Sequence, residues 1–226
     1  GHHTQTMLAA ENGDLPPFRR FMDDRRYSEG PSRYPIDGAF IEGWGLYSES
    51  LGADLGCYKD PYQLIGRLSA ELFRSCRLVV DTGIHAMGWS VERAVAFMTE
   101  NTAASEGNVD AEVKRYCTWP GQAVGYKMGE IEIWRLRRRF MAAFGPAADV
   151  RTFHELVLLN GSLPLRIIEE LIEEHISEAT ADAAGEGGAQ AAGGKGDATD
   201  GMFGAGLAVG LLVAGAAAIA LARRGN

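Results

Sequence analysis

The feature that most constrains this chain is the stretch from residue 202 to residue 222, which contains no charged side chain. A helix over this stretch, at about 1.5 Å per residue, is about 31 Å long and matches the hydrocarbon core of a bilayer. The sequence therefore predicts a transmembrane helix here, although a soluble Ala/Gly helix or a disordered tail is the alternative. Insertion would depend on its larger apolar residues, which are Phe203, Leu207, Val209, Leu211, Leu212, Val213, Ile219 and Leu221.

Charges beside this stretch predict its orientation. Arg223 and Arg224 follow it directly, so the positive-inside rule places the tail 223–226 in the cytoplasm. We therefore expect a single-pass membrane protein whose domain is extracellular or lumenal, with a cytoplasmic domain as the competing arrangement. Gly206 and Gly210 form a G-x-x-x-G pattern, which would allow helix-mediated self-association.

The segment before the apolar stretch differs from the rest of the chain. Residues 179–201 contain no large apolar side chain, so they are predicted to form a flexible linker. Residues 1–178 remain as one soluble domain. The net charge of −8 argues against a nucleic-acid partner, which would require a basic face.

The spacing of apolar residues predicts a mainly α domain, because alternating strand patterns are hard to find. Asp60 before Pro61 is a typical helix start, and Ser90 is a typical N-cap. Residues 12–39 contain four prolines and are expected to be mostly irregular. The predicted helices cover residues 40–55, 60–80, 91–101, 109–117, 122–144, 150–159 and 164–176.

Two short clusters contain side chains that can bind a metal. His2 and His3 are adjacent, and imidazole nitrogen is a common zinc ligand. Glu42 and Glu49 are seven residues apart and therefore share one helix face, next to Trp44. Solvated surface acids are the alternative interpretation of this pair.

A second set of polar residues lies further along the chain. Gln122, Tyr126 and Glu130 share one face of a predicted helix, next to a row of glycines at every fourth position from Gly121. The glycine row predicts close approach of another helix, so the polar row should have buried partners. His85 is expected in a turn after the helix that ends at Val80, where it either caps that helix or reaches a cleft. Arg77 and Asp81 are expected to pair, and the run of arginines at 135 and 137–139 is expected to be solvated.

Five motifs together resemble the bacterial family called domain of unknown function 885, over about residues 1–177. That family is thought to be similar to the gluzincin metallopeptidases, and its usual motif is H-E-x-x-P-G-H-H-x-Q. Its His-Glu pair would precede Gly1, so we expect the chain to be a C-terminal portion without this pair. The motifs are G-H-H-T-Q at 1–5, E-G-W-G-L-Y at 42–47, D-T-G-I-H at 81–85, G-W-S at 88–90 and P-G-Q-A-V-G-Y-K at 120–127.

The resemblance implies a gluzincin-like helical domain that binds zinc. His2 or His3 would be one zinc ligand and Glu42 another, while Glu49 would orient a ligand or close the site. Tyr126 is a candidate for stabilising an oxyanion, with core packing as its alternative role. His85 would be a second catalytic residue, and Gln122 would bind substrate.

These features lead to one expected function and two alternatives. The expectation is a membrane-anchored zinc-dependent peptidase that acts on a peptide or another amide. The first alternative is an inactive ectodomain of the same fold that binds partners. The second is a hydrolase of other amides or of esters, because the chemistry of the site would be the same.

Overall fold

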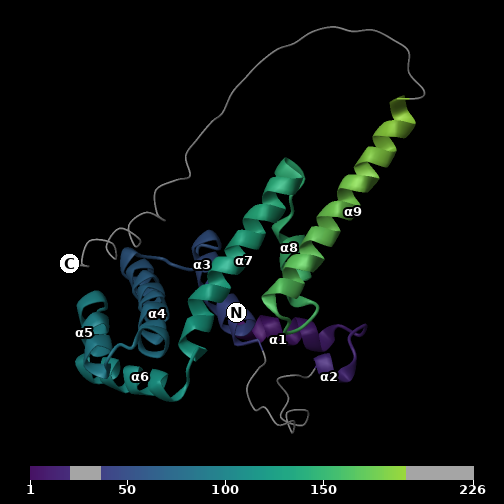
Figure 1. Cartoon of the computed structure of the whole chain (residues 1–226). Coiled ribbons are helices and arrows are strands. Elements are labelled where there is room, and N and C mark those ends of the chain that lie inside the picture. Colours follow the sequence, from purple (N-terminus) through teal and green to yellow (C-terminus); the bar gives the residue numbers. More distant parts are fainter. Residues whose placement is uncertain (21–36, 192–226) are drawn as a thin grey trace, which may run out of the picture. The chain divides into compact units, whose positions relative to one another are not determined.

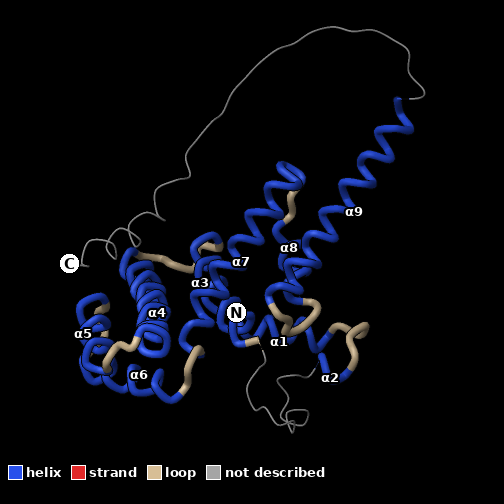
Figure 2. The backbone as a smooth tube through the Cα atoms, viewed as in Figure 1, coloured by secondary structure: helices blue, strands red, loops and turns tan. Residues whose placement is uncertain are grey.

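The computed structural model describes residues 1–20 and 37–191, and this part of the chain is helical, with no β-strand (Figures 1 and 2). The prediction of a mainly α fold is thus confirmed. Residues Gly1–Ala184 form one compact unit, and Gly185–Asn226 are assigned to a second. The α-helices are α1 (His2–Glu11), α2 (Pro17–Arg20), α3 (Gly38–Asp54), α4 (Pro61–Met87), α5 (Val91–Asn101), α6 (Glu106–Thr118), α7 (Gln122–Phe144), α8 (Val150–Leu158) and α9 (Leu165–Ala191), and the 3₁₀ turn η1 (Gly145–Ala147) follows α7.

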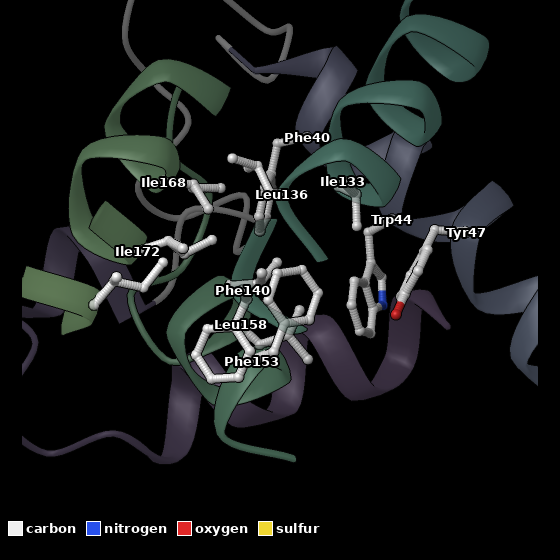
Figure 3. Close-up of a cluster of buried hydrophobic side chains, with 12 residues drawn as sticks. Phe40, Trp44, Tyr47, Ile133, Leu136, Phe140, Phe153, Leu158, Ile168 and Ile172 are labelled. Carbon is white, nitrogen blue, oxygen red and sulfur yellow. The ribbon is translucent and has the colours of Figure 1, made fainter. Parts of the chain in front are cut away.

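The larger core cluster joins α3, α7, α8 and α9 (Figure 3). The most extensive helix contact is between α3 and α7. Aromatic side chains lie in the centre of this cluster, where the Phe140 ring centroid is 4.7 Å from that of Phe144 and 5.8 Å from that of Phe153. Such buried aromatic groups contribute much of the apolar area that drives packing. The buried members are Phe40, Trp44, Tyr47, Ile133, Leu136, Phe140, Phe153, Val157, Leu158, Ile168, Ile172 and Ile176.

A second core cluster forms where α4, α5 and α6 meet. It includes Val80, Met98 and Val113, which are fully buried, and α7 contributes Ala123 from its first turn. The helix α7 therefore connects the two clusters, with its first turn in one and its middle in the other (Figure 1). This places the first turns of α7 against both α3 and α4.

The helix α4 is longer than the sequence predicted. Its start is as expected, because the Asp60 side chain accepts a hydrogen bond from the Gln63 N–H at 2.9 Å. Its end is at Met87 rather than at Val80, and Gly88, with φ of 66°, terminates it. Gly83 lies inside the helix, and glycine is needed there because the Trp89 ring occupies the space that a Cβ would need. The expectation of a turn around His85 was therefore wrong.

The C-terminal helix also extends beyond its predicted end. The helix α9 continues to Ala191, although residues from 179 on were predicted to form a flexible linker. Several alanines follow Ser177, and alanine has the highest helix propensity, so the helix can continue without an apolar face. The rest of the linker and the apolar stretch 202–222 lie outside the described residues. Within the described ranges, no helix is long and apolar enough to span a bilayer.

The region from 12 to 39 is not wholly irregular where it is described. The short helix α2 begins at Pro17, and α3 begins at Gly38, two residues before its predicted start at Phe40. Proline is well tolerated in the first turn of a helix because its missing N–H would have no partner there.

Candidate functional site

Two glycines bring the backbones of α3 and α7 into direct contact. A Cβ on Gly43 would be 2.5 Å from the carbonyl carbon of Gly129 and 2.9 Å from the Glu130 nitrogen. A Cβ on Gly125 would lie 3.3 Å from the Ala39 nitrogen. The close approach predicted from the glycine row is thus present at Gly125 and Gly129. Gly121 has another role: with φ of 83° it is the N-cap of α7.

His2 and Glu42 come together where α1 meets α3. The His2 Nε2 atom lies 3.6 Å from the Glu42 Oε2 atom, and the Glu42 side chain is 26% exposed. Gly45 makes this arrangement possible, because a Cβ there would lie 2.7 Å from Cε1 of His2. The two glycines of the E-G-W-G motif therefore have separate roles: Gly43 admits α7 and Gly45 admits the imidazole.

Other residues of the G-H-H-T-Q motif help to position His2. Its Nδ1 atom lies 3.4 Å from the side-chain oxygen of buried Gln5, and in the tautomer that donates from Nδ1 the Nε2 lone pair faces Glu42. The indole N–H of Trp44 donates to the Gly1 carbonyl at 3.2 Å and holds the start of α1 on α3. A carboxylate oxygen and an imidazole nitrogen at 3.6 Å are too far apart for a good hydrogen bond.

The other candidate metal residues lie away from this pair. His3 is exposed, and it makes no hydrogen bond or ion pair with the described residues. Glu49 pairs with Arg74 of α4 at 2.6 Å, and its carbonyl accepts from the Tyr58 hydroxyl. No group of three or more His, Cys, Asp or Glu side chains in the described ranges is arranged to hold a metal ion. Within the described ranges, His2 and Glu42 therefore have no third such side chain beside them.

Glu42 is one of the residues that line a groove of about 860 Å³. The start of α3 and the first turns of α7 line it, and its polar side chains besides Glu42 include Thr118 and Gln122. Trp119 and Met128 on its rim are 44% and 47% exposed. The motifs at 42–47 and 120–127 therefore meet in one concave surface. The lining residues are Gly38, Ala39, Ile41, Glu42, Thr118, Trp119, Pro120, Gly121, Gln122, Val124, Gly125 and Met128.

The polar row on α7 has buried partners, as the sequence predicted. Gln122 accepts a hydrogen bond from Arg77 at 3.1 Å, and the Tyr126 ring stacks on the same guanidinium at 4.2 Å. Glu130 is 3% exposed and accepts from Lys127 at 2.6 Å. Burial raises the pKa of Glu130, and Lys127 only partly offsets this effect. Tyr126 lines a different cavity from the one that contains Glu42.

Asp81 does not pair with Arg77, contrary to the expectation. Both of its carboxylate oxygens accept from the Gly121 N–H at 3.1 Å, so it anchors the start of α7. His85 is exposed in the last turn of α4, and its Nε2 atom donates to the Tyr116 carbonyl at 2.9 Å. His85 thus ties α4 to α6, and none of its contacts in the described part of the chain is with Glu42 or Tyr126.

A polar cluster around buried Tyr47 was not predicted from the sequence. The Tyr47 hydroxyl lies 2.8 Å from Nε2 of His154 and accepts from Arg137 at 3.2 Å. Burial, followed by the charge of Arg137, lowers the pKa of His154. Arg137 also stacks on Trp134, so the arginine run is not uniformly solvated. These residues are distant in sequence, and only Tyr47 belongs to a motif.

Comparisons with known proteins found one matching family and a similar solved structure. A family model described as bacterial protein of unknown function (DUF885) matches residues 1–172. A solved structure from Colwellia psychrerythraea, described as a candidate lipoprotein, is 41% identical and superposes with a TM-score of 0.69. The match covers 79% of this chain and 28% of that protein, so the chain spans less than a third of the relative's length. A search of curated proteins found no match.

Proposed function

This chain belongs to the bacterial DUF885 family, and we propose that it contributes part of the active site of a membrane-anchored, gluzincin-like zinc peptidase. The observation that carries the proposal is the His2–Glu42 pair beside the groove. Two donors that each lie about 2.0–2.2 Å from one zinc ion at a tetrahedral angle are about 3.4 Å apart. The observed 3.6 Å between Nε2 and Oε2 fits this value.

The donor types also fit zinc. The zinc ion, when bound, would polarise the scissile carbonyl and activate water. His2 offers an imidazole nitrogen on a ring that contacts Gln5, and Glu42 offers a carboxylate oxygen. The remaining ligand and the general base correspond to the His-Glu pair that the family's usual motif places ahead of Gly1. In this proposal they come from the larger protein.

The groove provides room for a substrate chain. Its wall is largely apolar, and Gln122 offers an amide that can hydrogen-bond to a peptide backbone. In this proposal Gln122 positions the substrate, whereas Glu49 acts through Arg74 by holding α3 against α4. Tyr126 and His85 remain candidates for catalytic roles, although their contacts in the described residues favour packing.

The membrane part of the proposal rests on the sequence alone. The uncharged stretch 202–222 would form the transmembrane helix, with Arg223 and Arg224 on the cytoplasmic side and the domain outside the cytoplasm. Digestion of the domain by a protease added to the cytoplasmic side of sealed vesicles would contradict this orientation.

Metal analysis of the full-length protein tests the zinc site. We expect the Glu42→Gln variant to lose zinc and peptide turnover, because an amide oxygen is a poorer ligand than a carboxylate. Glu174→Gln is the matched control, since Glu174 is exposed on α9. Gly45→Ala should also lower the zinc content, because its methyl group displaces the His2 ring. Full zinc content in both Glu42→Gln and Gly45→Ala would refute the proposed site.

A further inference from the structure

Among the residues that the structure describes, no acidic side chain pairs with the buried cation Arg77. Its side chain is 6% exposed, and its guanidinium lies 4.2 Å from the centre of the Tyr126 ring and 5.4 Å from that of Tyr116. Nη2 donates only to the neutral amide of Gln122, and buried Nε has no hydrogen-bond partner among the described residues. A buried charge is costly unless it is paired, and aromatic stacking offsets only part of that cost.

Arg77 lines a cavity of about 510 Å³ between α4, α6 and α7. Two further arginines, Arg74 and Arg115, line the same cavity, and Glu112 is its one acidic side chain. Glu112 accepts from the Tyr116 hydroxyl at 3.0 Å and pairs with Arg115 at 3.7 Å, while Arg74 pairs with Glu49 at 2.6 Å. Arg77 is thus the arginine of this wall that no carboxylate of the described residues pairs with. The charges in the wall therefore favour an anionic occupant. The remaining lining residues are Gly66, Ser69, Ala70, Phe73, Thr102, Ala103, Ala104, Asn108 and Tyr126.

One residue links this cavity to the groove that contains Glu42. Gln122 lines the groove, and its side-chain oxygen accepts from Arg77 at 3.1 Å and from Arg115 at 3.3 Å. Both arginines line the cavity on the other side of this amide. The arginines are therefore one hydrogen bond away from a residue of the groove, and a substrate chain that extended past the Gln122 amide would bring its end to them.

We propose that the Arg77–Arg115 cavity binds the free C-terminal carboxylate of the substrate peptide. A planar guanidinium matches a carboxylate in both charge and shape. The site would then select for chain ends, and cleavage would fall close to the C-terminus of the substrate. The identity of the ligand rests on the proposed peptidase function, whereas binding of a carboxylate by the cavity does not.

Two small probes that differ in one group test the cavity. N-acetyl-phenylalanine carries the carboxylate, and N-acetyl-phenylalaninamide replaces it with a neutral amide. We expect calorimetry on the full-length protein to show the acid binding on the order of 10- to 100-fold more tightly, the range for a charge-assisted hydrogen bond. The Arg77→Gln variant should lose this preference, and Arg77→Lys should retain part of it. Equal binding of both probes by the wild type would overturn the proposal.

Folding and metal content are measured on the same samples. Arg166→Gln is the control, because Arg166 is 82% exposed on α9 and should leave the preference unchanged. If Arg77→Gln fails to fold, Arg115→Gln replaces it, since that side chain is 40% exposed. A preference that survives the loss of either arginine overturns the inference. If the protein contains zinc and is active but does not prefer the acid over the amide, only the carboxylate inference is refuted. If it prefers the acid but contains no zinc, the carboxylate site is supported and the proposed peptidase function is refuted.

Discussion

Replacing Gly129 with alanine tests how closely α3 and α7 are packed. A Cβ there would lie 2.7 Å from the Gly43 Cα and would also collide with the carbonyl oxygen of Ala39. Both obstacles are backbone atoms, so the helices must separate. Overpacking of this kind costs about 1–3 kcal/mol, and we expect the upper end here. The gain in helix propensity from Gly to Ala returns about 1 kcal/mol, so the net loss should be about 2 kcal/mol.

Gly66→Ala is the matched control for this substitution. Gly66 lies inside α4 with no atom near its missing Cβ, so alanine should stabilise the protein by about 1 kcal/mol. For a domain of this size, about 1 kcal/mol shifts Tm by roughly 2–4 °C. Thermal unfolding followed by circular dichroism should therefore show Gly129→Ala about 4–8 °C below the wild type and Gly66→Ala slightly above it. Equal shifts for both variants would refute the argument from backbone contact.

Two further predictions concern buried polar groups. Burial lowers the pKa of His154 in the folded state, so the contribution of His154 to stability is complete above its ordinary pKa of 6.5 and is lost as the pH falls below that value. In urea unfolding, the stability advantage of the wild type over His154→Gln should therefore shrink between about pH 7 and pH 5. A difference that stays constant over this range would contradict the argument. Asp81→Asn should cost about 1 kcal/mol, because the carboxylate at the Gly121 N–H loses its charge at the start of α7. Asp110→Asn, on the surface of α6, should change urea unfolding little.

The interiors of the longer helices could be predicted because each has clear periodicity and an explicit start. The end of α4 could not, because Gly83 in sequence resembles a turn, whereas the Trp89 ring fills its vacant side in the fold. The proximity of Glu42 to one of the two histidines was expected from the order of the motifs, but the motifs did not distinguish His2 from His3. The contact between Tyr47 and His154 joins residues 107 positions apart, and no local spacing indicates such a pair.

The E-G-W-G motif also determines where this protein can change. Gly43 faces the backbone of α7, so a side chain there would separate the two helices, whereas Gly45 faces the His2 ring, which a side chain would displace. Trp119 and Met128, on the rim of the groove, are about half exposed, so we expect substitutions there to disturb the contact between α3 and α7 less than a side chain at Gly43. In the proposed peptidase, new substrate preferences should therefore arise by exchange of rim side chains above a floor that keeps Gly43. A library randomised at the rim should yield folded variants with altered selectivity, whereas the folded members of a library randomised at Gly43 should contain glycine there.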